Sequence, residues 1–99
     1  MTYPLDGITV LDLTHVLAGP YCANQLADLG ARIIKVERPG LGDDPRHFPP
    51  FVDGESAYFA TLNRGKQSIA LDLRAAPDRA IFDRLLAHAD VLIENNRPG

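Results

Sequence analysis

Three arginines stand at positions where this chain could bind a phosphate-bearing ligand. Arg38, Arg74 and Arg97 each follow shortly after an apolar segment that is typical of a buried strand. A guanidinium binds phosphate or carboxylate through two parallel hydrogen bonds, so these positions favour an anionic ligand. Arginine makes up eight of the ten basic residues. Codon usage is the simpler explanation of that excess, and arginines at loop ends are as often merely solvated.

The histidines and the single cysteine form no other pattern that predicts chemistry. Their spacing does not match that of metal ligands, and no serine, histidine and aspartate can be arranged as a nucleophilic triad. His15 ends a predicted strand and is either a site residue or a polar cap. We expect His47 to be solvated and His88 to lie at a helix end. Cys22 is expected to be a small core residue on a helix that faces the sheet.

The loop after the first predicted strand lacks the glycines of a nucleotide-binding fingerprint. Residues 14–20 read T-H-V-L-A-G-P, without the G-x-G-x-x-G of dinucleotide-binding proteins, and a Walker loop is also absent. Arg38 stands where either the 2′-phosphate of NADP or the 3′-phosphate of coenzyme A could bind. Asp43 and Asp44, in a loop rich in glycine and proline, are expected to be solvated, and Asp12 to be structural.

Alternating strand and helix signals must position these residues. Strands are predicted at 8–13, 31–36, 67–71 and 90–93, and helices at 20–29, at 57–62 and from Pro77. Pro20 is expected at the first helical position, Gly30 at the helix end, and Ser56 as the cap of the short helix. One apolar stripe is predicted on the last helix, at Ile81, Phe82, Leu85 and Leu86. Residues 39–54 hold four of the eight prolines, so an irregular loop is predicted there.

The alternation of strands and helices predicts the fold class α/β with a parallel sheet. The first strand, helix and strand have the size of one βαβ unit. In an open parallel sheet, ligands bind at the carboxyl ends of the strands, which is where the three arginines and His15 are expected. The helix that begins near Gly19 adds backbone N–H donors suited to an anion.

Composition and charge exclude several classes of protein. Ten basic and thirteen acidic residues give a net charge of −3, which argues against nucleic acid as a partner. No apolar run is long enough for a membrane span, and no secretory signal is recognisable at the start. One cysteine fits a reducing compartment, so a cytoplasmic protein is expected. The chain stops just after its fourth strand, so we expect residues 1–99 to be the N-terminal part of a longer domain.

Several motifs in order give the chain a resemblance to one family, the family III CoA-transferases. They are D-G-I at 6–8, L-D-L-T-H-V-L-A-G-P at 11–20, A-D-L-G-A at 27–31, I-K-V-E-R-P-G at 34–40, G-D-D-P-R at 42–46, L-N-R-G-K at 62–66, S-I-A-L-D-L at 68–73, D-V-L-I-E-N at 90–95 and R-P-G at 97–99. The resemblance covers nearly the whole chain without a gap. It implies a Rossmann-like CoA-binding domain, of which this chain is one part.

The resemblance also implies the chemistry and the partners. The family moves coenzyme A between carboxylic acids through an aspartyl-CoA thioester, with acyl-CoA as substrate and no permanently bound cofactor. Its subunits form interlocked homodimers. The nucleophilic aspartate of the family lies beyond Gly99, and none of the ten aspartates here matches it. The chain therefore has no predicted catalytic residue, and residues 1–99 alone are expected to be inactive.

Matching positions carry the family's CoA contacts over to this sequence. His15, Val16, Leu17 and Ala18 would lie near the thiol end, and Arg38 would meet the adenosine 3′-phosphate. Leu71, Asp72, Leu73 and Arg74 would flank the adenine and phosphates, followed along the groove by Asn95, Asn96 and Arg97. Three positions depart from the family. Formyl-CoA transferase has Gln in place of Leu17, so oxalate or formate specificity is not predicted. Many members have Lys in place of Arg74, and the family usually has an aromatic in place of Asn96.

Three other functions remain open at this point. A 2-methylacyl-CoA racemase would share the fold but use proton transfer, and its acid and base would also lie beyond Gly99. The stretch S-A-Y-F-A-T-L-N-R-G-K at 56–66 looks more like the transferases. A non-catalytic module that binds CoA or a nucleotide would require the natural protein to end at Gly99. An NADP-dependent reductase is disfavoured because the glycine fingerprint is missing.

Overall fold

Four parallel strands form the sheet that carries the predicted ligand edge. The computed structural model describes residues 2–97, so Pro98 and Gly99 of the last family-like motif lie outside it. The strands lie in the order β5-β2-β1-β6 and span Thr9–Asp12 (β1), Arg32–Glu37 (β2), Lys66–Ala70 (β5) and Val91–Ile93 (β6). Every pairing between neighbours is parallel. The α/β fold class and the parallel sheet are therefore confirmed, with strand bounds that differ from the predicted ones by at most one residue.

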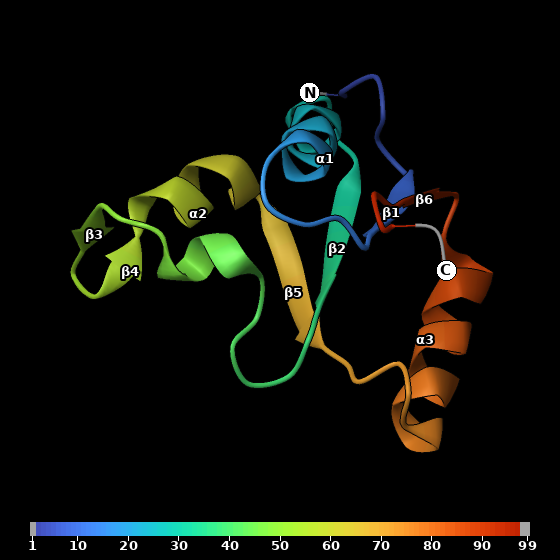
Figure 1. The fold of residues 1–99 in the computed structure, drawn as a ribbon. Helices are drawn as coiled ribbons and strands as arrows, with labels where there is room; N and C mark the ends of the chain where they lie inside the picture. The colour runs from blue at the N-terminus through green and yellow to red at the C-terminus, as the bar shows by residue number, and fades with distance from the viewer. Residues whose placement is uncertain (1, 98–99) are drawn as a thin grey trace.

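Helices cover both faces of this sheet (Figure 1). They are α1 (Ala18–Asp28) and α3 (Ala76–His88), while α2 (Ala57–Asn63) packs against α1. Val10 belongs to a core cluster with Ala23 of α1, whereas its neighbour Leu11 belongs to a second cluster with Phe82 of α3. Successive side chains of a strand point to opposite faces, so β1 is buried on both sides. This explains why its sequence does not alternate between buried apolar and exposed polar residues.

Helix α1 begins earlier than predicted. Its first residue is Ala18, so Pro20 is the third helical residue and not the first. Proline is tolerated there because the N–H groups of the first turn have no partner within the helix. Gly30 ends the helix as expected, with a φ of 105°. Its N–H donates to Ala27 O at 3.0 Å and that of Ala31 to Leu26 O at 3.1 Å, the pattern of a Schellman cap.

The segment predicted as irregular, 39–54, contains two short elements, and a third follows it directly. They are a 3₁₀-helix, η1 (Asp44–His47), and a hairpin of β3 (Phe51–Val52) and β4 (Glu55–Ser56), which projects away from the sheet (Figure 1). Asp53 and Gly54 form the two-residue turn with φ values of 51° and 81°. Asp-Gly between extended residues is a strong hairpin signal, and the high density of prolines hid it. Ser56 caps α2 as predicted, because its Oγ accepts from Phe59 N at 3.2 Å.

Two expected core positions are exposed. Cys22 points to solvent, because the helical period places Ala23 rather than Cys22 against the sheet. The apolar stripe of α3 buries Phe82, but Leu86 is 42% exposed. His88 lies in the last turn of α3, as expected. In the described part of the chain, no helix is long and apolar enough to cross a lipid bilayer.

Candidate functional site

Three neighbouring cavities open at the carboxyl ends of the strands: a small one of about 70 Å³, lined in part by His15, Arg38 and Asp43, and two larger ones. Cavity A has a volume of about 310 Å³ and is lined by Leu13, His15, Val36, Glu37, Arg38, Pro39, Leu71, Asp72, Leu73, Arg74 and Asn96. Cavity B has a volume of about 540 Å³ and is lined by His15, Val16, Leu17, Ala18, Asp44, Asn95, Asn96 and Arg97. His15 and Asn96 belong to both. All twelve residues predicted to contact CoA line one cavity or the other, and their contact with a ligand stays a prediction.

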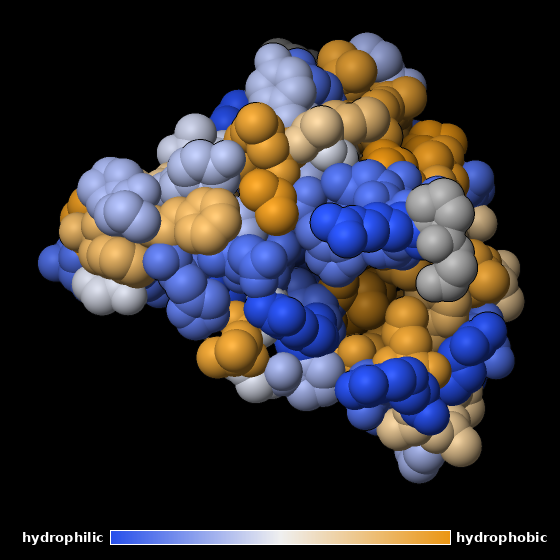
Figure 2. Space-filling model, in the orientation of Figure 1, coloured by the Kyte–Doolittle hydropathy of each residue, from blue (hydrophilic) through white to orange (hydrophobic). Residues whose placement is uncertain are grey.

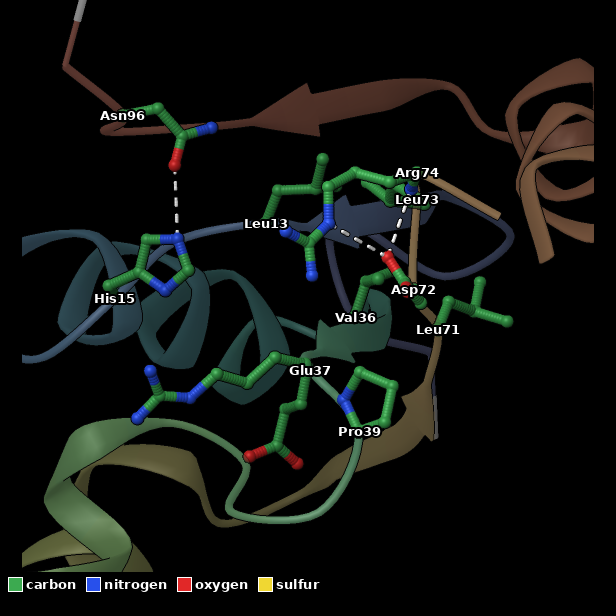
Figure 3. A pocket seen from close by; sticks show the side chains of 11 residues that line it. Leu13, His15, Val36, Glu37, Pro39, Leu71, Asp72, Leu73, Arg74 and Asn96 are labelled. Atoms are coloured by element: carbon green, nitrogen blue, oxygen red, sulfur yellow. Dashed lines mark hydrogen bonds and ion pairs between the residues drawn. The ribbon is translucent and has the colours of Figure 1, made fainter. Parts of the chain in front are cut away.

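Cavity A has an apolar floor and a charged rim. Leu13, Val36 and Leu71 supply the apolar surface of the cavity, and charged side chains such as Arg74 and Asp72 stand at its edge (Figure 3). On the surface, hydrophilic side chains surround a hollow with an apolar floor (Figure 2). Such a surface suits a ligand that has both a flat apolar group and phosphates.

The two arginines of cavity A make exposed ion pairs. Arg38 Nη2 lies 2.5 Å from Asp44 Oδ1, and its Nε donates to Gly42 O at 2.8 Å. Arg74 Nε lies 3.3 Å from Asp72 Oδ1. The Arg74 N–H, and then its guanidinium, donate to this carboxylate and lower the pKa of Asp72. Exposed pairs of this kind contribute little to stability, so both guanidiniums can be shared with an anion.

His15 is fixed by the loop that follows β6. Its N–H donates to Asn95 Oδ1 at 3.0 Å, and its carbonyl accepts from Asn95 Nδ2 at 3.1 Å. The Asn95 side chain thereby continues the pairing of β1 with β6 beyond the last strand residue. The His15 ring lies between the cavities, with Nε2 3.0 Å from Asn96 Oδ1 (Figure 3). Asn96 therefore makes a polar contact at the position where the family usually has an aromatic.

A buried ion pair lies beneath the residues that follow β1. Lys35 Nζ is 3.0 Å from Asp43 Oδ2, and both side chains are at most 2% exposed. Asp43 also accepts from Val16 N at 3.3 Å with each carboxylate oxygen, and Lys35 Nζ donates to Thr14 O at 3.3 Å. The expectation that Asp43 is solvated is wrong, because its segment folds back and brings the carboxylate against Lys35 of β2 and the N–H of Val16. Asp44 is exposed, as expected.

Glu37, the last residue of β2, holds together the segment that leads to η1. Its carboxylate accepts from Asp43 N at 2.8 Å, from Arg46 Nε and Nη2 at 2.7 Å each, and from Ser68 Oγ. Burial alone would raise the pKa of Glu37, but the hydrogen bonds from Arg46, Ser68 and the Asp43 N–H outweigh it and lower the pKa from 4.5 to about 2. Glu37 is therefore ionised wherever this segment is folded near neutral pH.

A second buried pair joins β1, α2 and β5. Lys66 Nζ lies 2.7 Å from Asp12 Oδ2, and the exposed fractions of the two side chains are 2% and 0%. Nζ also donates to Asn63 Oδ1 at 2.7 Å and to Pro20 O at 3.0 Å. Burial lowers the pKa of Lys66, and the carboxylate of Asp12 opposes that shift. The structural role expected for Asp12 is confirmed by these contacts.

The sequence reasoning missed Lys35, Glu37, Asp43 and Lys66 as residues that shape the site. A signal for two of them was present, because Lys35 and Glu37 interrupt the apolar run of β2, which is covered on both faces. A charge in such a strand must find a buried partner.

Of the other two histidines, His47 is exposed with Nε2 2.9 Å from Leu41 O, which agrees with its expected place at the surface.

Comparison with known proteins identifies the family of the chain. CoA-transferase family III matches residues 5–99. The chain is 56% identical to acetyl-CoA:oxalate CoA-transferase of Acetobacter aceti over 97% of its length, 25% of that relative. It is 52% identical to human succinyl-CoA:glutarate CoA-transferase, also over 97% of its length, 22% of that relative.

A solved structure gives the same picture. The chain superposes on a CAIB/BAIF family protein from Brucella suis with a TM-score of 0.89 and 48% identity, over 97% of this chain and 26% of the other. The chain thus spans about a quarter of the length of its relatives. The resemblance drawn from the motifs is confirmed: the chain belongs to CoA-transferase family III.

Proposed function

We propose that the protein to which this chain belongs transfers coenzyme A between two carboxylic acids, and that cavities A and B form part of its CoA site. The observation that carries the proposal is the convergence of all twelve predicted contact residues on the carboxyl edge of one parallel sheet. That edge is the usual ligand site of open α/β sheets. Membership of the family supplies the reaction class.

Cavity A suits the adenosine end of coenzyme A. Arg38 and Arg74 stand on its rim and can each take a phosphate, because their carboxylate partners are exposed and weakly held. Leu71 and Leu73 offer apolar surface for an adenine ring. Cavity B, with Val16 on its wall, then lies toward the pantetheine and thiol end.

The chemistry would be supplied by an aspartate outside residues 1–99. In the proposed reaction, the aspartate attacks the thioester carbonyl, which releases CoA thiolate and leaves a mixed anhydride. The thiolate then attacks the aspartyl carbonyl, forming an aspartyl-CoA thioester and releasing the first carboxylate. A second carboxylic acid takes the acyl position and accepts CoA by the same two steps in reverse. Residues 1–99 would bind CoA and would not catalyse transfer on their own.

The assembly and location of the whole protein follow from the same proposal. We propose an interlocked homodimer, which is the arrangement that the family resemblance implies. We propose a cytoplasmic location, which fits the single cysteine of this chain. One cysteine cannot form a disulfide within residues 1–99, and proteins of a reducing compartment rarely contain disulfides.

Calorimetry with the full-length protein tests the CoA site. Arg38→Ala and Arg74→Ala should each raise the Kd for CoA by about ten-fold or more, since a charge-assisted hydrogen bond contributes about 1.5–3 kcal/mol. Arg79→Ala is the matched control, because Arg79 forms an exposed pair with Asp83 on α3. Unchanged affinity in both site variants would refute this placement of the phosphates.

An activity assay tests the reaction class. The full-length protein is incubated with acetyl-CoA or succinyl-CoA and with oxalate, glutarate or mesaconate, the compounds in the names of its relatives. Formation of a new acyl-CoA supports transfer. Racemisation of a 2-methylacyl-CoA without any transfer would instead identify the racemase, and absence of CoA binding would reject both.

A further inference from the structure

Val16 has a backbone conformation that its residue type disfavours. Its φ is 67°, in the left-handed region, and a β-branched side chain is a genuine outlier there. Among the other described residues except glycine, only Asp53 has a positive φ, and it lies in the hairpin turn. Val16 stands on the wall of cavity B between His15 and Leu17. Strain of this kind persists only where the surrounding structure enforces it.

Asp43 supplies that restraint. Both of its carboxylate oxygens lie 3.3 Å from Val16 N, and its side chain is 2% exposed. Lys35 holds the carboxylate at 3.0 Å and also donates to Thr14 O at 3.3 Å. The pair therefore contacts the backbone on both sides of His15, whose own N–H is fixed from the opposite side by Asn95.

Lys35 makes no contact of its own at the ligand surface, whereas Asp43 Oδ1 also lies 3.9 Å from His15 Nδ1 and Asp43 borders the small cavity between Thr14 and Arg38. Neither Lys35 nor Asp43 lines cavity A or cavity B. Asp43 also caps η1 by accepting from Asp44 N at 2.9 Å, but one carboxylate oxygen suffices for that bond. The second oxygen and the lysine would be unnecessary for a cap alone.

We propose that the buried Lys35–Asp43 pair is a positioning device that holds Val16 in the left-handed conformation, so that residues 15–17 are preset against the pantetheine end of CoA. The inference rests on the proposed function and deepens it. It adds two positioning residues, which act through the backbone of residues 14–16. Presetting a loop raises affinity because less conformational freedom is lost on binding.

The test compares two ligands on the full-length protein. Asp43→Asn keeps the size of the side chain but removes its charge and one of the two acceptor oxygens. It should raise the Kd for CoA by about ten-fold, within the range seen when supporting residues are removed. The Kd for adenosine 3′,5′-bisphosphate, which has no pantetheine, should change less than about two-fold. Asp83→Asn, on the exposed face of α3, is the control for loss of one carboxylate.

A second variant distinguishes positioning from general stabilisation. Glycine adopts a φ of 67° without strain, so in the Val16→Gly background the effect of Asp43→Asn on CoA should fall below about three-fold. Should Asp43→Asn fail to fold, Lys35→Gln provides the same comparison, because Lys35 holds both Asp43 and Thr14 O.

The outcomes separate this inference from the proposed function. Equal losses for both ligands, or an unchanged effect in the Val16→Gly background, would overturn the positioning role. Wild-type binding of CoA with no effect of Asp43→Asn would overturn it too, while leaving the proposed function intact. A wild-type protein that binds neither ligand would reject the proposed function itself.

Discussion

Replacement of Glu37 by glutamine should reduce both the stability of the protein and its sensitivity to acid. Glu37 is 5% exposed as a residue, and its carboxylate accepts from Arg46, Ser68 and Asp43 N. In Glu37→Gln, the amide nitrogen would face one of these donors. Arg46 would then lose an acceptor in a partly buried place, and the loop leading to η1 would lose its anchor to β2.

The magnitude follows from the pKa of Glu37, which the fold lowers from 4.5 to about 2. Since one unit corresponds to about 1.4 kcal/mol, ionised Glu37 stabilises the folded state by about 3 kcal/mol. This stabilisation is fully present above the unfolded value of 4.5 and is lost as the pH falls toward about 2. Between about pH 6 and about pH 3.5, the wild type should lose about 1.4 kcal/mol through this group alone.

Urea unfolding of the full-length protein, followed by circular dichroism at both pH values, measures this loss. The wild type should lose about 1.4 kcal/mol more than Glu37→Gln over that interval, because glutamine does not titrate. Asp83→Asn serves as the control, since the Asp83 side chain is 62% exposed and pairs only with Arg79 at 3.5 Å. Equal losses in the wild type and Glu37→Gln would refute the reasoning, because they would show that Glu37 gains nothing from its partners.

Two further substitutions test the packing beneath the site in the full-length protein. Lys66→Arg should lower the free energy of unfolding by about 3 kcal/mol despite keeping the charge, because a planar guanidinium cannot replace the compact ammonium beside Asp12. The reverse exchange in the exposed Arg64–Asp28 pair, Arg64→Lys, should cost less than about 1 kcal/mol in urea unfolding, and similar costs at both positions would contradict the argument. Gly19→Ala places a Cβ 2.2 Å from Thr14 Cβ, so it should weaken CoA binding in calorimetry, and wild-type affinity would show that this contact is easily relieved.

The sheet could be predicted from the sequence because its signals are local. The run I-T-V-L-D-L at 8–13 is too apolar for an exposed strand, and Gly30 marks a helix end that only glycine or asparagine adopts readily. The strand order β5-β2-β1-β6 was not predicted, although βαβ connectivity favours parallel neighbours. The site residues could be placed for the same reason, since carboxyl ends of parallel strands meet at one edge.

The buried pairs could not be predicted because they depend on where a loop returns. Asp43 lies eight residues after Lys35, in a segment whose composition indicates a solvated turn. The turn at Gly42, with a φ of 71°, and the hydrogen bond from Asp43 N to Glu37 bring the carboxylate back to Lys35. No periodicity contains that information. The same holds for Lys66 and Asp12, which are 54 positions apart and meet across the sheet.

The distribution of basic residues corrects the first impression that the arginines are the unusual feature. All eight arginines have exposed positions, so their number is compatible with a simple codon preference. The two lysines are the selective choice. The ammonium of Lys66 has three N–H donors, and it meets three acceptors, Asp12 Oδ2, Pro20 O and Asn63 Oδ1. Lys35 Nζ contacts both Asp43 Oδ2 and Thr14 O. A compact ammonium satisfies such a buried set, whereas a flat guanidinium with five donors would leave some unpaired. The lysines therefore fix the edge of the sheet from within, and the arginines remain on its surface for an anionic ligand.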